Sequence, residues 1–314
     1  MKVLVTGGAG FLGKRLTTRL LARPDIDEIV LLDMAPAKGL SDPRLRIVAG
    51  DIADPALMGR LIDGKTAGVF HLAAVLSGQS ESDFDLGMRI NVDASRLLLE
   101  TCRKRGNRPR VVFTSSVAVY GGDLPDVVTD DLALRPASSY GTEKAIAELL
   151  LSDYSRRGFV DGRVMRLPTV SVRPGLPNSA ASSFASGIIR EPLNGVDAVC
   201  PVAPETRLWL LSPRRAAECL AHGFDLDADA LGGQRAVNLP GITVTAGEMV
   251  EALRRVAGEE TASRVRWERD PAIERIVGTW PGAWDTTRAE ALGFKGDANF
   301  EQVVRAYMED DLRR

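Results

Sequence analysis

The sequence is poor in the side chains that most metalloenzymes and acid–base enzymes use. Its 314 residues include two histidines, His71 and His222, and three cysteines, Cys102, Cys200 and Cys219, none of them in a C-x-x-C spacing. Zinc sites of the histidine and cysteine type need three or four such ligands at close spacing, so no metal is expected. An odd, dispersed cysteine set is typical of reduced thiols in a cytosolic protein. Any acid–base chemistry must therefore work without histidine.

A strong net charge and long apolar runs are also missing. The formal net charge is −2, and no basic block is longer than the three residues Arg103–Arg105. This argues against nucleic acid or an acidic membrane surface as the main partner. No stretch approaches the roughly 20 apolar residues of a membrane-spanning helix. The first apolar run, Val3–Val5, gives way to Gly7-Gly8 without a cleavage-like tail, so a cytoplasmic location is expected.

Short β-branched runs alternate with helical patterns through the first half of the chain. Such alternation implies right-handed crossovers between parallel strands. We therefore predict an α/β fold, a Rossmann-type doubly wound parallel sheet with a smaller C-terminal substrate-binding cap. Strands are expected at 3–6, 28–33, 45–48, 68–71, 111–115 and 162–167, and helices at 11–21, 56–62, 85–105 and 140–156.

The second half of the chain has a different character. Residues 174–213 are rich in proline, serine and glycine, with no lasting helix or strand pattern, as in loops that form lids or substrate walls. Helical patterns return at 213–224, 245–257 and 300–312. We expect a nucleotide-binding domain over residues 1–170, to which segments near 205–240 return. A substrate-binding cap is expected mainly over residues 171–314.

A glycine-rich turn follows the first predicted strand. Gly7, Gly10 and Gly13 have the spacing G-x-x-G-x-x-G, and a helix beginning with Phe11 and Leu12 follows at once. Glycine lets the backbone turn sharply and approach a pyrophosphate, and the helix N-terminus presents N–H groups to the phosphates. A simple tight turn is the alternative. The position between a strand and a helix favours dinucleotide binding.

An acidic residue closes the second predicted strand. Asp33 lies twenty residues after Gly13, where a carboxylate can accept the adenosine ribose hydroxyls and repel a 2′-phosphate. This favours NAD over NADP, although a solvated strand-end carboxylate would look the same. Asp51 and Ile52, after the third strand, are expected at the adenine edge. That position could equally serve to cap the next helix.

A tyrosine and a lysine four residues apart are candidates for acid–base chemistry without histidine. Tyr140 and Lys144 lie on one face of a predicted helix, and a nearby cation lowers the pKa of a phenol toward the working range. Lys144 can also bond the nicotinamide ribose. Ser116 follows the fifth strand, where its hydroxyl can stabilise charge on the reacting oxygen. An exposed helical pair is the alternative interpretation of Tyr140 and Lys144. A nucleophilic serine is excluded because the G-x-S-x-G elbow is missing.

The order of these motifs resembles the extended short-chain dehydrogenases/reductases, and within them the NAD-dependent epimerase/dehydratase group. The resemblance implies Tyr140 as general acid/base, Lys144 as its partner, Ser116 as the third hydroxyl, and a homodimer. Further matching motifs are His71-Leu72-Ala73-Ala74, Asn91-Val92, Ser115-Ser116-x-x-x-Tyr120-Gly121 and Asp285–Arg288. By this resemblance the cofactor also contacts Leu72, Ala73, Ala74, Asn91, Tyr140, Lys144, Pro168 and Val170.

Stretches at 83–89, 153–159, 173–178 and 182–184 resemble the branch of this family that oxidises D-erythronate. The expected reaction is NAD-dependent oxidation of this sugar acid at C2, giving 2-dehydro-D-erythronate. A carboxylate needs a guanidinium clamp, which Arg173 or Arg207 could supply. Ser77, Ser116, Tyr140 and Asn178 are the other expected substrate contacts. Each residue alone could be an ordinary surface side chain.

Two other functions remain open. A nucleotide-sugar epimerase or dehydratase would use the same three catalytic residues with NAD retained. The segment Leu167-Pro168-Thr169 departs from the aromatic-Asn-Pro segment that many sugar-nucleotide epimerases carry, which weakens that interpretation. A catalytically silent NAD-binding regulator is the third possibility. The complete set of Ser116, Tyr140 and Lys144 argues against it.

Overall fold

The computed structural model of the protein describes residues 1–176 and 180–312, and it is built around a seven-stranded sheet. The strands lie in the order β10-β6-β5-β4-β1-β2-β3, and every neighbouring pair is parallel. The order reverses between β1 and β4, the point at which such sheets bind ligands. The predicted Rossmann-type fold is confirmed. The strands are β1 (Lys2–Thr6), β2 (Glu28–Asp33), β3 (Leu45–Ala49), β4 (Thr66–His71), β5 (Arg110–Ser116), β6 (Asp161–Leu167) and β10 (Ala236–Asn238).

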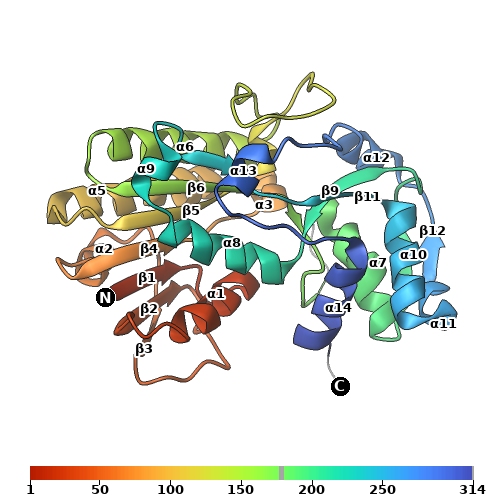
Figure 1. Ribbon diagram of the computed structural model, residues 1–314, viewed down its shortest axis with the longest axis horizontal. Coiled ribbons are helices and arrows are strands. Elements are labelled where there is room, and N and C mark those ends of the chain that lie inside the picture. Colours follow the sequence, from red (N-terminus) through yellow and green to blue (C-terminus); the bar gives the residue numbers. More distant parts are fainter. Residues whose placement is uncertain (177–179, 313–314) are drawn as a thin grey trace.

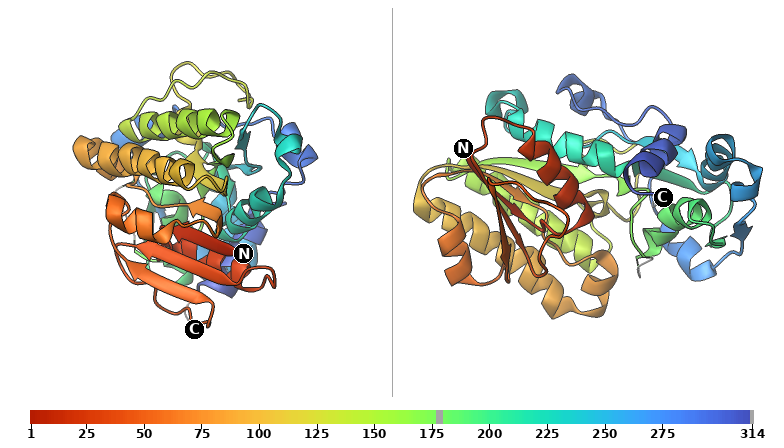
Figure 2. Two further views of the ribbon diagram at one scale, coloured as in Figure 1. Left: turned by 90° about the vertical axis from the view of Figure 1, so that its left-hand side faces the viewer. Right: turned by 90° about the horizontal axis from the view of Figure 1, so that it is seen from below.

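Helices cover both faces of this sheet (Figures 1 and 2). On one face, Val3 and Val5 of β1 pack with residues of α1 (Phe11–Leu21) and α8 (Pro213–Asp225). On the other, Leu4 packs against α2 (Pro55–Leu61), α5 (Ala94–Arg105) and α6 (Ser139–Arg156). Because both faces are covered, β1 is buried along its whole length, as parallel strands generally are.

Most elements after residue 171 lie beside the sheet (Figure 1), and their buried side chains form a second apolar core. A three-stranded sheet, β11-β9-β7, and a two-stranded sheet, β12-β8, support it. Its strands are β7 (Thr169–Val170), β8 (Ala198–Cys200), β9 (Arg207–Leu211), β11 (Ile242–Thr245) and β12 (Val265–Trp267). Its helices are α7 (Phe184–Leu193), α10 (Ala246–Ala257), α11 (Glu259–Ala262), α12 (Pro271–Val277) and α14 (Phe300–Asp310).

The expectation of an irregular segment between residues 174 and 213 is wrong for α7, β8 and β9. Helix α7 carries Phe184, Ile188 and Ile189 on its buried side, at spacings that suit a helix. Serines, Gly187 and Pro192 obscure that pattern in the sequence. Pro192 lies in the last turn of the helix, so the hydrogen bond that its missing N–H removes is lost at the helix end and not in its middle.

The predicted helix over residues 85–105 is also wrong in detail. The structure has α3 (Ser77–Ser82), α4 (Phe84–Gly87), a π-helical turn over Met88–Asp93 and then α5. The buried Asn91 lies in the π-helical turn. Its Oδ1 accepts the Val75 N–H at 2.9 Å, and its Nδ2 donates to the Val75 carbonyl at 3.0 Å. These two bonds give the turn a tertiary partner that no local pattern in the sequence reveals.

Candidate active site

A cavity of about 1200 Å³ lies beyond the carboxyl ends of the central strands and extends to the cap. Pockets for one small ligand are typically about 300–1,000 Å³, so this cavity has room for a dinucleotide and a small substrate. Most of the predicted cofactor residues line it. They are Gly7, Gly10, Phe11, Leu12, Gly13, Asp33, Asp51, Ile52, Leu72, Ala73, Ala74, Tyr140, Lys144, Pro168 and Val170.

The glycine turn is shaped in a way that only glycine allows. Gly7 has a φ of +73°, and a Cβ there would lie 2.7 Å from the Ala73 nitrogen. A Cβ on Gly13 would lie 2.3 Å from the Gly7 carbonyl oxygen, so α1 packs directly on the turn. The N-terminus of α1 has no side-chain cap at Gly10. Free N–H groups therefore remain for phosphate oxygens, and the turn fits the pyrophosphate of NAD.

Asp33 ends β2 at the rim of this turn. Its Oδ2 accepts the Ala9 N–H at 2.9 Å, which fixes the carboxylate beside the glycine motif. No cationic side chain in the described part of the chain forms an ion pair with Asp33. The uncompensated negative charge suits ribose hydroxyls and disfavours a 2′-phosphate. Asp51 instead pairs with Arg89 at 2.6 Å and accepts the Ala53 N–H at 2.8 Å.

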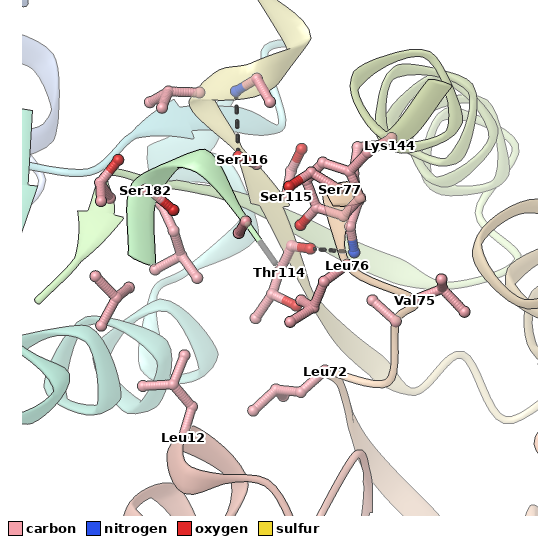
Figure 3. A pocket seen from close by; sticks show the side chains of 18 of the residues that line it. Leu12, Leu72, Val75, Leu76, Ser77, Thr114, Ser115, Ser116, Lys144 and Ser182 are labelled. Atoms are coloured by element: carbon pink, nitrogen blue, oxygen red, sulfur yellow. Dashed lines mark hydrogen bonds between the residues drawn. The ribbon is translucent and has the colours of Figure 1, made fainter. Parts of the chain in front are cut away.

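The three expected catalytic side chains all line the cavity, and Figure 3 shows two of them, Ser116 and Lys144. Tyr140 lies in the first turn of α6, which Ser138 caps. One turn later, Lys144 Nζ donates to the Thr114 carbonyl at 3.0 Å and lies 5.7 Å from the centre of the Tyr140 ring. Ser116 Oγ accepts the Ala118 N–H at 3.1 Å.

A glycine allows the catalytic helix to approach the serine turn. A Cβ on Gly141 would lie 2.1 Å from the Ala118 carbonyl oxygen, so any larger residue would push α6 away from Ser116. The structure therefore places a phenol, an ammonium and a hydroxyl in one cavity. No group of three or more His, Cys, Asp or Glu residues among those described could hold a metal ion.

Arg173 and Ser77 line the cavity, and Arg173 comes from the cap side. Arg173 Nη2 donates to Ser182 Oγ at 2.9 Å, and its backbone N–H donates to Ser186 Oγ at 3.0 Å. Arg190 Nη1 donates to the Arg173 carbonyl at 2.8 Å. Arg173 forms no salt bridge with any described carboxylate. An anion in the cavity could therefore take its guanidinium as a partner.

Two predicted site residues are placed differently, and a third lies outside the part of the chain that the structure describes. Arg207 lies exposed on β9 and is not among the described residues that line the cavity. Asn91 is buried behind the cavity wall and uses its amide on Val75 and neighbouring side chains rather than on a ligand. Asn178 lies outside the described residues.

Comparisons with known proteins agree with this geometry. A sequence model of the NAD dependent epimerase/dehydratase family matches residues 3–205. The chain belongs to this family. Its cofactor is accordingly NAD, as the glycine turn and Asp33 predict.

Two relatives that match over nearly their whole length carry the same enzyme name. A D-erythronate dehydrogenase of Cupriavidus necator is 64% identical, covering 99% of this chain and 98% of that protein. A D-erythronate dehydrogenase of Haemophilus influenzae is 47% identical, covering 99% and 100%. A crystal structure of a nucleoside-diphosphate-sugar epimerase from Agrobacterium tumefaciens superposes with a TM-score of 0.95 at 42% identity, covering 99% and 94%. The resemblance inferred from the sequence motifs is confirmed for the family and for its closer branch.

The electrostatics around this family's tyrosine differ from the prediction. The sequence predicts that Lys144 lowers the pKa of Tyr140, but in the protein alone that pKa is raised to about 12. Burial is the main cause, Glu143 adds to the rise, and Arg173 opposes it. Burial also lowers the pKa of Lys144 to about 8, with Glu143 and Glu148 opposing. The prediction from spacing omits the cost of placing either charge inside the protein.

His71, interpreted from the sequence as structural, is fully enclosed by protein. Its Nδ1 lies 2.8 Å from Thr6 Oγ1 and its Nε2 lies 2.8 Å from Ser95 Oγ. Burial, and then the charge of Lys144, lowers the pKa of His71 to about 3. The imidazole is therefore neutral at physiological pH and ties β4 to β1 and α5.

Sequence reasoning missed several residues of the cap side of the cavity. Ser182, Ser186 and Arg190 form hydrogen bonds with Arg173 and line the cavity, which Trp280 and Trp284 also line. Arg190 directly follows the buried Ile188 and Ile189 of α7, a position that could have marked it as a buried cation. The tryptophans lie about a hundred residues further along the chain, and no motif connects them to the site.

Proposed function

We propose that the protein is an NAD-dependent dehydrogenase that oxidises D-erythronate at C2 to 2-dehydro-D-erythronate. The observation that carries this proposal is Arg173, a guanidinium without a carboxylate partner in the described chain, in the same cavity as Ser116, Tyr140 and Lys144. A small sugar acid supplies both the carboxylate and the secondary alcohol that these groups need. The names of the two D-erythronate dehydrogenases support the same substrate.

In this mechanism the protein holds the alcohol and removes its proton. Ser116 Oγ donates to the C2 oxygen, and the Tyr140 phenolate accepts the hydroxyl proton. NAD, when bound, supplies the acceptor for the C2 hydride and a positive charge within the cavity. Lys144 and Arg173 add positive charge near the phenol, which favours its ionised form against the effect of burial.

The substrate carboxylate is assigned to Arg173. Its hydrogen bond to Ser182 and the Arg190 bond to its carbonyl hold the guanidinium at the cavity wall. A bidentate pair with a carboxylate would then fix which carbon of the sugar acid faces Tyr140. Ser77, at the start of α3, is positioned to bond a further hydroxyl. Replacing Arg173 by Lys should raise KM for the acid because an ammonium lacks the planar fork.

The test is a panel of four- and five-carbon aldonates and UDP-sugars, read as NADH absorbance. The proposed activity gives stoichiometric NADH from added NAD and D-erythronate. A nucleotide-sugar epimerase, the activity for which the Agrobacterium protein is named, would convert a UDP-sugar with no net NADH. That result, or faster oxidation of another aldonate, would overturn the substrate assignment.

Three organisational features belong to the same proposal. Residues 1–170 hold NAD, and residues 171–314 mainly contact the substrate. The protein acts in the cytoplasm; no described helix is long and apolar enough to cross a membrane.

It forms a homodimer through α5 and α6, which is supported by Leu149, 66% exposed on the outer side of α6. Light scattering of the wild type and of Leu149→Glu should give a dimer and a monomer, respectively.

A further inference from the structure

A fully buried carboxylate lies next to Lys144 in sequence, and the proposed mechanism does not use it. Glu143 is 0% exposed. Its Oε2 accepts hydrogen bonds from Asn91 Nδ2 at 2.6 Å and from Ser80 Oγ at 3.0 Å. These donors come from the π-helical turn and from α3, so Glu143 joins the catalytic helix to the segment that bears Ser77.

The surroundings of Glu143 leave no room for it to move aside. Its Oε1 is enclosed and has no hydrogen-bond partner among the described residues. The backbone of Gly87 closes this side, because a Cβ there would lie 2.3 Å from Oε1. The carboxylate is therefore held by two donors at one oxygen and by close packing at the other.

Glu143 has no cationic partner of the usual kind. The other buried acid on α6, Glu148, pairs with Arg166 at 2.8 Å. Glu143 forms no salt bridge with any described residue, and neither does Lys144, whose ammonium donates only to the Thr114 carbonyl among the bonds described. Isolated buried charges are costly. Glu143 and Lys144 do not form an ion pair, but both are buried, and opposite charges inside a protein attract over longer distances than they do in water.

We propose that Glu143 is a positioning residue of the active site, the buried counter-charge that keeps Lys144 in its ammonium form, with Asn91 and Ser80 holding the carboxylate in place. The inference deepens the proposed function and rests on it for the role of Lys144. It adds a positioning residue to the three expected catalytic residues, one that acts through Lys144 and does not contact the substrate.

The balance of charges around Lys144 agrees with this geometry. Burial lowers the pKa of Lys144, and Glu143 is the first group to oppose that effect. Burial also raises the pKa of Tyr140, and Glu143 is the first charge to add to it. Removing the Glu143 charge should lower both values. The charged or titratable groups that act on Lys144 or Tyr140 are Glu143 and Glu148 of α6, His71 of β4 and Arg173 after β7, and Arg166 of β6 pairs with Glu148.

The direct test follows Lys144 itself in the NAD-free protein. The pH dependence of its acetylation by trace acetic anhydride, read by peptide mass spectrometry, gives the midpoint of its titration. We expect Glu143→Gln, which keeps the size and can still accept the Asn91 bond, to lower this midpoint by about 1 pH unit. Ser80→Ala removes one donor without changing any charge and should leave the midpoint near that of the wild type.

Two further variants separate charge from folding. Glu143→Asp keeps the charge and should keep the wild-type midpoint within a few tenths of a unit. Glu143→Ala should give the lowered midpoint if Glu143→Gln does not fold. An unchanged midpoint in the neutral variants, or an equal change in Ser80→Ala, would show that Glu143 is only a packing residue and overturn the inference.

The pH profile of kcat provides the functional readout. In Glu143→Gln, both limbs should move to lower pH, whereas a purely structural role would reduce kcat without moving the profile. The two proposals fail separately. If the wild type makes no NADH from D-erythronate but the acetylation midpoint moves as expected, the substrate assignment fails and the counter-charge role stands.

Discussion

A single phenolic oxygen carries the proton transfer in the proposed reaction. Tyr140→Phe removes that oxygen and keeps the ring that packs at the start of α6. We expect NADH formation from D-erythronate to fall by at least roughly 10²–10⁴-fold, because the phenolate is the group that accepts the hydroxyl proton in the proposed reaction. NAD affinity by calorimetry should change little. Turnover close to that of the wild type would contradict the role of Tyr140.

The preference for NAD depends on one carboxylate at the end of β2. Asp33→Ala removes the acceptor for ribose hydroxyls and the charge that repels a 2′-phosphate. The ratio of kcat/KM for NAD over NADP should fall by about tenfold or more, corresponding to ~1.4 kcal/mol. Kinetics with both cofactors check this. Asp51→Asn, which loses mainly a charge paired with Arg89, serves as the control and should keep the preference.

Residues of the cofactor side could be predicted because their signals are local. Gly7, Gly13 and Asp33 carry spacing and position in neighbouring elements, and the structure places them together. Roles that depend on distant partners could not be predicted. Arg207 has the same chemistry as Arg173, but only the fold shows that one is exposed on β9 and the other lines the cavity.

Among the elements, the turn from β1 into α1 is tightly packed. In Gly13→Ala the new Cβ would lie 2.3 Å from the Gly7 oxygen, whereas in Gly10→Ala the nearest atom is 3.3 Å away. We expect Gly13→Ala to lower the free energy of unfolding by about 1–3 kcal/mol. Gly10→Ala should destabilise less and mainly weaken NAD binding, since Gly10 lines the cavity. Thermal unfolding and calorimetry separate the two; equal stabilities would contradict this packing argument.

Elements were predictable where packing follows a regular period. The helices α1, α6, α8 and α10 lie within two residues of their predicted bounds. The segment from α3 to the π-helical turn was not predictable from the sequence. The hydrogen bonds of Asn91 to Val75 join residues sixteen apart and override the simple helical period. The same bonds, continued by Asn91 to Glu143, connect the helix break to the catalytic helix.

At the scale of the whole molecule, a charged contact joins the helices of the seven-stranded sheet to the second apolar core. Asp310 of α14 in the cap accepts Arg15 Nη1 of α1 at 2.7 Å and Arg214 Nη2 of α8 at 2.6 Å. Helix α14 belongs to the core of the cap, while α1 and α8 belong to the sheet layer. The sequence predicts each helix but not their meeting, because 295 residues separate Arg15 from Asp310.

This contact predicts a pH-dependent difference in stability. Burial alone would raise the pKa of Asp310, but Arg214 and Arg15 lower it below its ordinary value. A carboxyl group with a lowered folded-state pKa stabilises the fold above its unfolded pKa of about 3.9, and this contribution is lost as the pH falls through the folded-state value. Asp310→Asn should therefore cost ~0.5–1 kcal/mol at pH 7 and progressively less below about pH 3.9. Asp153→Asn, which breaks the exposed Arg156 pair on α6, should have no measurable effect in the same denaturant titrations. A cost for Asp310→Asn that stays constant down to low pH would mean that its packing, not its charge, joins the cap to the sheet.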